Sequence, residues 1–324
     1  AWGNPLFGSD SQDGFVNQPD FDESLDTFRA EIKGFLDYGV ISGVEAGVVF
    51  SDRSKTKINS GAYLTAPEYP GDGPIPNVLG VADLSFIGIN GVLAYDSLGL
   101  FNSGYYIEND AALVQNDRFG DTYTVEEELL TFYTKFDIEA DLGDTYLRGN
   151  FGVQIIDVDQ KSSGFNTTTN ATGVTDAAPV DGGADYTSVL PSLNLSLEVA
   201  ENQYVRTALS RVESRPRLDD MRPNAQVSFA FNDNQITNAN PENGPWSGSA
   251  GNANLRPLAA NQFDLSYENY FADSGFFAVA FFLKDLRNWH RDSSLLADFT
   301  SVYIPSFHQG SEGQTPATFK GCTL

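Results

Sequence analysis

The stretch from Glu128 to Leu142, ELLTFYTKFDIEADL, decides the fold of this chain. From Leu130 onward every second residue is apolar, with Thr134 as the one polar member, and the residues between them are polar or charged. Successive side chains of a β-strand point to opposite faces, so this pattern predicts a strand with one apolar and one hydrated side. A helix would mix the two sets around its circumference.

The alternation resumes after a tight turn at residues 143–145. Leu147 to Ile155 again carries apolar residues at every second position, apart from Gly149, so the two runs predict an antiparallel hairpin. The same unit recurs around residues 37–39, 200–202 and 273–275. About eight strands of about ten residues or more are therefore expected, which is the length that spans a bilayer when the strands tilt.

The connections between these hairpins are long, whereas the turns within them are short. A barrel of the bacterial outer membrane has this plan, with its long loops outside the cell. The hydrophobic stretch from Val78 to Leu100 is unusual for a loop and is expected to fold back on itself. The long links are expected at residues 52–123, 159–187, 213–261 and 288–324, and residues 165–184 are the clearest loop by composition.

A soluble β-sandwich that binds glycans is the alternative fold, because its strands alternate in the same way. Sandwich strands are usually about five or six residues long, shorter than the runs found here. The pattern therefore favours an all-β fold, an antiparallel transmembrane β-barrel with long extracellular loops. No stretch approaches the length of apolar sequence that a transmembrane helix requires.

The composition limits the partners of this chain. The formal net charge is −25 and the sequence pI is about 4.2. Such a surface repels phosphate backbones, so nucleic acid is not an expected partner. The chain also opens and closes on residues typical of loop interiors, and we expect both ends to continue in a longer protein.

The residues that common catalytic sites need are scarce. The two histidines are His290 and His308, and the one cysteine is Cys322. A zinc site needs closely set His or Cys ligands, and no nucleophile elbow, phosphate loop or dinucleotide motif is present. We expect no catalysis, no metal and no cofactor. Cys322 is either a free buried thiol or the partner of a cysteine beyond Leu324.

Several sequence blocks resemble the barrel of proteobacterial TonB-dependent receptors. They occur in the family's order and spacing from about residue 20 to residue 292, and they resemble most the branch often associated with carbohydrate uptake. The blocks are Thr124–Glu128 with Tyr133 and Leu147–Val153, then Leu190–Leu195 with Val205–Arg211 and Arg215–Pro216, and finally Gly251–Pro257 with Phe263–Ser266 and Phe281–Leu286.

The resemblance implies a bacterial outer-membrane location and a barrel of about 22 strands, of which residues 1–324 supply a central part. It also implies an N-terminal plug, a TonB-contacting segment and closing strands, none of which this chain contains. The implied function is import of a bulky nutrient, with the TonB system, outer-membrane lipid and a small ligand as partners. An oligosaccharide is the expected ligand, and a siderophore or other metal chelate is the alternative.

A barrel this wide encloses a lumen, so the inward positions of its strands are polar. Charged side chains at these positions would be unstable in a dry core without partners, which supports a hydrated lumen. The residues expected to face the lumen or the plug are Asp137, Glu139, Asp141, Arg148, Gln154, Glu198, Arg206, Asp264 and Glu268.

Aromatic side chains in or beside the long links are the candidates for ligand binding. Their faces can stack on sugar rings while neighbouring polar groups bond the hydroxyls. The same rings can instead pack the loops together or lie at the membrane interface, and the sequence leaves both roles open. The candidates are Tyr63, Tyr69, Tyr105, Tyr106, Trp246 and Trp289.

Overall fold

A computed structural model of the chain describes residues 12–69, 71–143, 145–170, 173–230, 232–238, 240–271, 274–304 and 308, and the backbone of residues 316–323. Within this part, no helix combines the length and the apolar character needed to cross a membrane.

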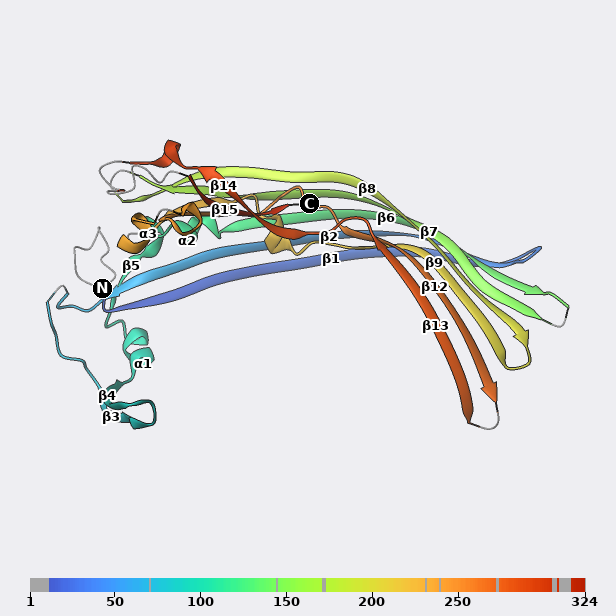
Figure 1. Ribbon diagram of the computed structural model, residues 1–324, viewed down its shortest axis with the longest axis horizontal. Helices are drawn as coiled ribbons and strands as arrows, with labels where there is room; N and C mark the ends of the chain where they lie inside the picture. The colour runs from blue at the N-terminus through green and yellow to red at the C-terminus, as the bar shows by residue number, and fades with distance from the viewer. Residues whose placement is uncertain are drawn as a thin grey trace.

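Eight strands form one continuous antiparallel wall, in which each strand pairs with the next along the chain (Figure 1). The wall confirms the predicted fold class. Its order is β1-β2-β6-β7-β8-β9-β12-β13. The strands are β1 (Gly14–Tyr38), β2 (Ile41–Thr65), β6 (Tyr123–Asp141), β7 (Tyr146–Thr169), β8 (Thr175–Ala200), β9 (Gln203–Ser214), β12 (Leu258–Phe271) and β13 (Gly275–Leu286).

Tight turns gather at one end of the wall, at the right of Figure 1. Gly39 has φ 63°, Gly143 has φ 75° and Asn202 has φ 61°. Glycine adopts this left-handed region without steric cost, and asparagine does so more readily than most residues. The turn chemistry therefore matches the hairpins that the sequence predicts around residues 37–39, 143–145 and 200–202.

The other end of the wall carries the longer excursions. Between β2 and β6, β3 (Val78–Leu84) pairs with β4 (Ile89–Tyr95) in a separate hairpin, which confirms that Val78–Leu100 folds back on itself. The remaining elements of this excursion are η1 (Ser85–Ile87), α1 (Ser97–Asn102), β5 (Ile107–Asp110), η2 (Ala111–Leu113) and α2 (Asn116–Gly120).

The later excursions add a small sheet to the wall. Strand β10 pairs with β7 at Gln226 and Thr167, and β11, β15 and β14 continue from it. The side chain of Cys322 lies outside the described residues, so its predicted state stays untested. The helices and strands of these later excursions are η3 (Leu218–Met221), β10 (Ala225–Phe229), α3 (Asp233–Ile236), η4 (Pro241–Asn243), β11 (Trp246–Ala250), β14 (Arg291–Asp298), η5 (Thr300–Val302) and β15 (Pro316–Thr323).

The prediction of a long loop at residues 159–187 is wrong. Strands β7 and β8 stay paired as far as Thr169 and Thr175, so the connection between them is residues 170–174. The predicted link at 52–123 is also too long, because β2 continues to Thr65. Beyond the membrane an outward side chain need not be apolar, so the alternation fades although the backbone ladder continues.

The outward face of the wall carries the predicted apolar band. Ile32, Phe132 and Phe281 are 74%, 53% and 56% exposed, as lipid-facing side chains are in the absence of lipid.

The band ends at a row of acidic residues that are direct cross-strand neighbours. Like charges directly opposite each other destabilise a sheet, so this row requires water. The row is Asp26, Asp52, Glu128, Asp159 and Asp185.

An arginine in the apolar band should impair membrane insertion, whereas one on the opposite face should not. Phe136→Arg is expected to destabilise the inserted protein by about 2–4 kcal/mol, because the cation would lie against lipid. Asn150→Arg is the matched control on the other face. The measurement is reversible urea unfolding in lipid vesicles. Equal effects of the two substitutions would contradict the assignment of the faces.

Candidate functional site

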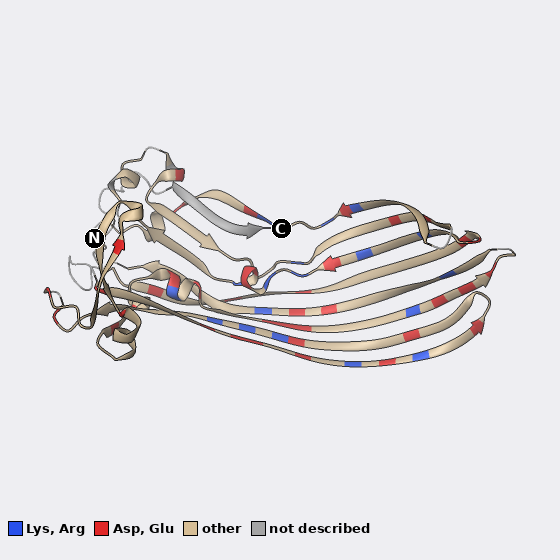
Figure 2. Ribbon diagram, turned by 90° about the horizontal axis from the view of Figure 1, so that it is seen from below, with Lys and Arg blue, Asp and Glu red and all other residues tan. Residues whose placement is uncertain are grey.

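Charged residues of both signs recur along the wall strands (Figure 2). Cross-strand pairing puts many of them on the face opposite the apolar band. We call it the hydrated face. A hollow of about 780 Å³ lies on it, formed by β6, β7, β8, β9, β12 and β13. Five of the predicted lumen residues line this hollow, namely Asp137, Glu139, Arg148, Arg206 and Asp264. Their position agrees with the predicted lumen role, which stays a prediction.

The other predicted lumen residues share this face. Asp141, Glu198 and Glu268 lie one row nearer the turns, where cross-strand pairing aligns them through Tyr146 and Tyr204. Gln154 lines a second hollow nearer β1. The alternation therefore brings all of the predicted residues to one surface, although they come from five strands.

Charged residues of β1 and β2 extend this surface and were missed by the sequence analysis. Lys33 lies 3.5 Å from Glu45, and Lys135 on β6 lies 3.2 Å from the same carboxylate. The Tyr133 hydroxyl donates a hydrogen bond of 2.8 Å to Glu31 and accepts one of 2.9 Å from Arg29. The signal was the alternation along β1 and β2, where Arg29, Glu31, Lys33 and Glu45 each follow an apolar residue.

Gly47 provides the seat for the Tyr133 ring. The two residues are direct partners across β2 and β6, and a Cβ on Gly47 would lie 2.6 Å from ring atoms of Tyr133. An aromatic side chain that covers a glycine on the neighbouring strand is a known way to fix strand register. The glycine thus holds the tyrosine flat on the hydrated face.

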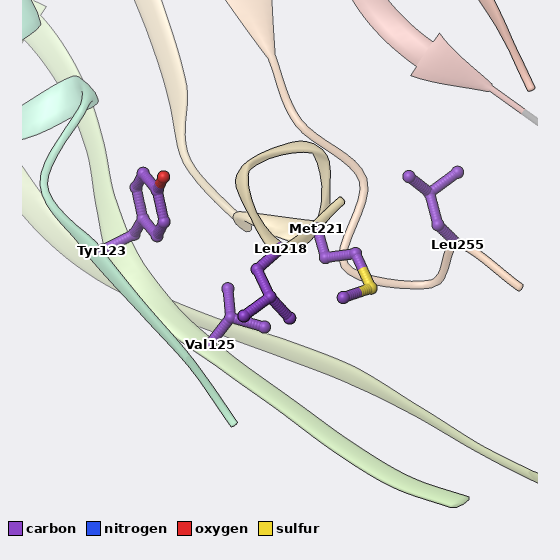
Figure 3. Packing of buried hydrophobic residues seen from close by; sticks show 5 residues of the cluster. All are labelled: Tyr123, Val125, Leu218, Met221 and Leu255. Carbon is purple, nitrogen blue, oxygen red and sulfur yellow. The ribbon is translucent and has the colours of Figure 1, made fainter. Parts of the chain in front are cut away.

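The excursion between β9 and β12 folds onto the hydrated face. We call its two arms, residues 215–224 and 251–257, the strap. Figure 3 shows Leu218 and Met221 of the first arm beside Tyr123 and Val125 of β6, with Leu255 from the second arm. All five side chains are at most 3% exposed. An apolar contact therefore anchors the strap to this face of the wall.

Ionic contacts reinforce this anchor. Asp219 on the strap lies 2.7 Å from the Lys55 ammonium and accepts a hydrogen bond of 2.5 Å from the Tyr123 hydroxyl. Burial opposes ionisation of Asp219, but these two bonds hold the pKa of its carboxyl below the usual value. Burial and the bond to Asp219 raise the pKa of Tyr123. Arg222 adds a contact of 3.3 Å to Asp121.

The two arms of the strap contact each other and the wall through backbone atoms. The Gln160 side chain on β7 donates 2.7 Å to the carbonyl of Ala253, and Asn252 donates 2.9 Å to the carbonyl of Asp220. A Cβ on Gly251 would lie 2.4 Å from the Arg222 carbonyl oxygen, so only glycine fits there. The sequence blocks Arg215–Pro216 and Gly251–Pro257 thus form the strap.

Tyrosines gather where the excursion between β2 and β6 leaves the wall. Tyr63 is 9% exposed and meets Phe15 edge to face at 5.3 Å. Tyr105 and Tyr106 meet at 5.2 Å, directly before β5, which pairs with β2 beside Tyr63. Tyr69 is half-buried in the turn that follows β2.

The tryptophans lie elsewhere. Trp246 is 3% exposed in an aromatic cluster, 5.0 Å from Phe229 and 5.7 Å from Phe299. It packs the loop sheet and presents no open face in this structure. Trp289 is 61% exposed after β13. The role of the six aromatic candidates in ligand binding stays a prediction.

No group of three or more His, Cys, Asp or Glu side chains with a metal-binding arrangement occurs among the described residues.

A family model described as "TonB dependent receptor-like, beta-barrel" matches residues 4–314. The chain belongs to this family. Its wall is accordingly part of a β-barrel of the bacterial outer membrane, as the sequence blocks predict.

Solved structures with low similarity to the chain include two receptors. One is a mutant of the ferric enterobactin receptor PfeA from Pseudomonas aeruginosa, with 15% identity and a TM-score of 0.38, covering 93% of this chain and 39% of that one. The other is the siderophore receptor PirA from Acinetobacter baumannii, with 9% identity and a TM-score of 0.35, covering 93% and 40%. No curated protein matches the chain.

Acid should loosen the strap of this TonB-dependent receptor. The pKa of Asp219 lies below its ordinary 3.8 in the folded protein. Its bonds to Lys55 and Tyr123 are therefore fully stabilising above pH 3.8 and are lost as the pH falls through the lower, folded value. A spin label at Asn254→Cys, in a Cys322→Ser background, should be immobile at neutral pH and become mobile as the pH falls below the folded pKa of Asp219.

The Asp219→Asn variant tests the cause. Its label should already be more mobile at neutral pH and should change less on acidification, because the charged bond to Lys55 is gone. The same mobility and the same acid response as in the parent protein would show that Asp219 does not hold the strap.

Proposed function

We propose that this chain forms part of the wall of an energy-coupled importer that takes up a bulky ligand through the outer membrane. The observation that carries the proposal is the division of one continuous wall into a lipid-compatible face and a charged, hollowed face. A wall of this kind encloses a hydrated passage. A plug domain and the TonB system would supply the gate and the energy, and catalysis has no part in this function.

For the ligand we propose an anionic metal chelate. Cationic side chains gather where the strap meets the hydrated face, and Arg217 keeps 79% of its side chain exposed there. An exposed guanidinium recognises anionic oxygen groups through paired hydrogen bonds. The cationic residues are Arg53, Lys55 and Lys57 on β2 and Arg215, Arg217 and Arg222 on the strap.

An oligosaccharide is the second candidate ligand. The exposed ring of Trp289 and the half-buried pair of Tyr105 and Tyr106 favour it, because aromatic faces stack on sugar rings. The burial of Trp246 and Tyr63 reduces the aromatic surface that is open to a sugar. Each cation of this group also has a carboxylate partner. The large exposed fraction of Arg217 is the feature that favours the chelate over the sugar.

Binding to the full-length receptor distinguishes these ligands. We expect the purified receptor in detergent to bind an anionic ferric tris-catecholate more tightly than a neutral maltooligosaccharide. Arg217→Glu should weaken chelate binding by about tenfold or more, which corresponds to about 1.4 kcal/mol. Isothermal titration calorimetry measures both affinities.

Lys161→Glu is the control, because it reverses a positive charge as Arg217→Glu does, but at a side chain that is 64% exposed on the outward face. Its affinity for the chelate should equal that of the parent receptor. Tighter binding of the oligosaccharide, unaffected by Arg217→Glu, would overturn the ligand assignment. A full-length protein that stays in solution without detergent would overturn the importer itself.

A further inference from the structure

A buried carboxylate lies beneath the strap. The Glu127 side chain, on the hydrated face of β6, is 0% exposed, and neither of its oxygens has a hydrogen-bond partner among the described residues. The ion pair within reach is with Arg215 of the strap, whose guanidinium is 3.6 Å away. Glu127 has no part in the anchor formed by Leu218, Met221 and Asp219.

The surroundings of Glu127 are dry and poor in hydrogen-bond donors. Gln160 is its direct cross-strand partner, and the Gln160 Oε1 atom is buried without a donor. The Tyr186 hydroxyl is likewise buried without a hydrogen-bond partner among the described residues. These buried polar atoms lie at the seam between strap and wall, closed to solvent.

An ionised carboxylate in a dry seam is stable only beside a positive charge. The strap brings two positive charges here, since Arg215 faces Glu127 and the Arg256 guanidinium lies 5.7 Å from the centre of the Tyr186 ring. Arg53 of β2 is the other direct cross-strand partner of Glu127, but its guanidinium is paired with Glu23 at 2.6 Å. The negative charge belongs to the wall. Lifting the strap would admit water to Glu127, whereas a strap that stays closed must keep Arg215 in place.

We propose that Glu127 and Arg215 form an electrostatic lock that sets whether the strap lies closed on the hydrated face. The strap covers the wall between the long loops and the hollow, so its position controls access to the hollow. That last step rests on the proposed import function, but the lock itself does not. The guanidinium of Arg215 is 34% exposed, so the lock is the part of the seam that a solute in the passage reaches first.

Removal of one partner and then of both tests the lock. Arg215→Met leaves Glu127 buried and unpaired, and the strap should open at neutral pH. The double variant Glu127→Gln with Arg215→Met removes the charge that demands water, and the strap should close again. Closure by the second substitution also shows that the single variant had folded. Lys161→Met, on the outward face and away from the strap, is the control for loss of a positive charge and should stay closed.

The measurement is the distance between spin labels at Asn254→Cys on the strap and Ser24→Cys on β1, in the full-length receptor with Cys322→Ser. Pulsed electron spin resonance should give one narrow distance for the parent, the control and the double variant. Arg215→Met should give a broad, shifted distribution with an open fraction at least about tenfold larger. No ligand is added, so a wrong ligand or transport assignment leaves this result unchanged.

A closed strap in Arg215→Met would overturn the lock. An open strap in the double variant would also overturn it, because the opening would then come from loss of the arginine's packing and not from an unpaired charge.

Discussion

The structure depends on the pairing of every long strand with its neighbours while one of its faces stays apolar. Lipid offers no hydrogen bonds, so a chain can cross it only if its backbone groups are satisfied within the protein. The six strands between β1 and β13 meet this condition, because each has an antiparallel partner on both sides. Because side chains alternate along each strand, the same pairing turns every polar position to the opposite face. The hydrated surface is thus a consequence of the lipid-facing one.

This constraint explains where the strap can bind. A polar wall has few apolar positions on its hydrated side, and Tyr123 and Val125 supply them beyond the end of the outward band. The strap places Met221 and Leu255 on this patch and surrounds it with ion pairs. Two interactions keep the strap on the wall. The apolar contact does not depend on charge, whereas the pairing of the buried Glu127 with Arg215 does.

Sequence reasoning succeeded where lipid imposes a period of two, and it failed where lipid ends. The run from Glu128 to Leu142 predicted its strand and both of its faces. The run from residue 159 to residue 187 was mistaken for a loop, because its outward side chains face water and show no apolar period. A hairpin in water and a loop have similar amino-acid compositions. Only the backbone pairing of β7 with β8 shows that residues 159–187 form a hairpin.

The candidate site shows the same division. The positions of Arg148 and Asp264 on the hydrated face follow from the alternation, because polar and apolar residues alternate along their strands. The contact of Arg215 with Glu127 joins residues 88 positions apart through the path of the strap (127 to 215). No local pattern encodes it. The blocks Arg215–Pro216 and Gly251–Pro257 marked the right segments, but their roles required the tertiary structure.

The most direct test of the two-faced wall is a spin-label scan of residues 130–141 in the full-length receptor in lipid vesicles. Collision with oxygen reports contact with lipid, and collision with a water-soluble nickel chelate reports contact with water. The account predicts that oxygen reaches the even positions and the nickel chelate reaches the odd ones. A period near 3.6 residues, or positions equally shielded from both reagents, would contradict it.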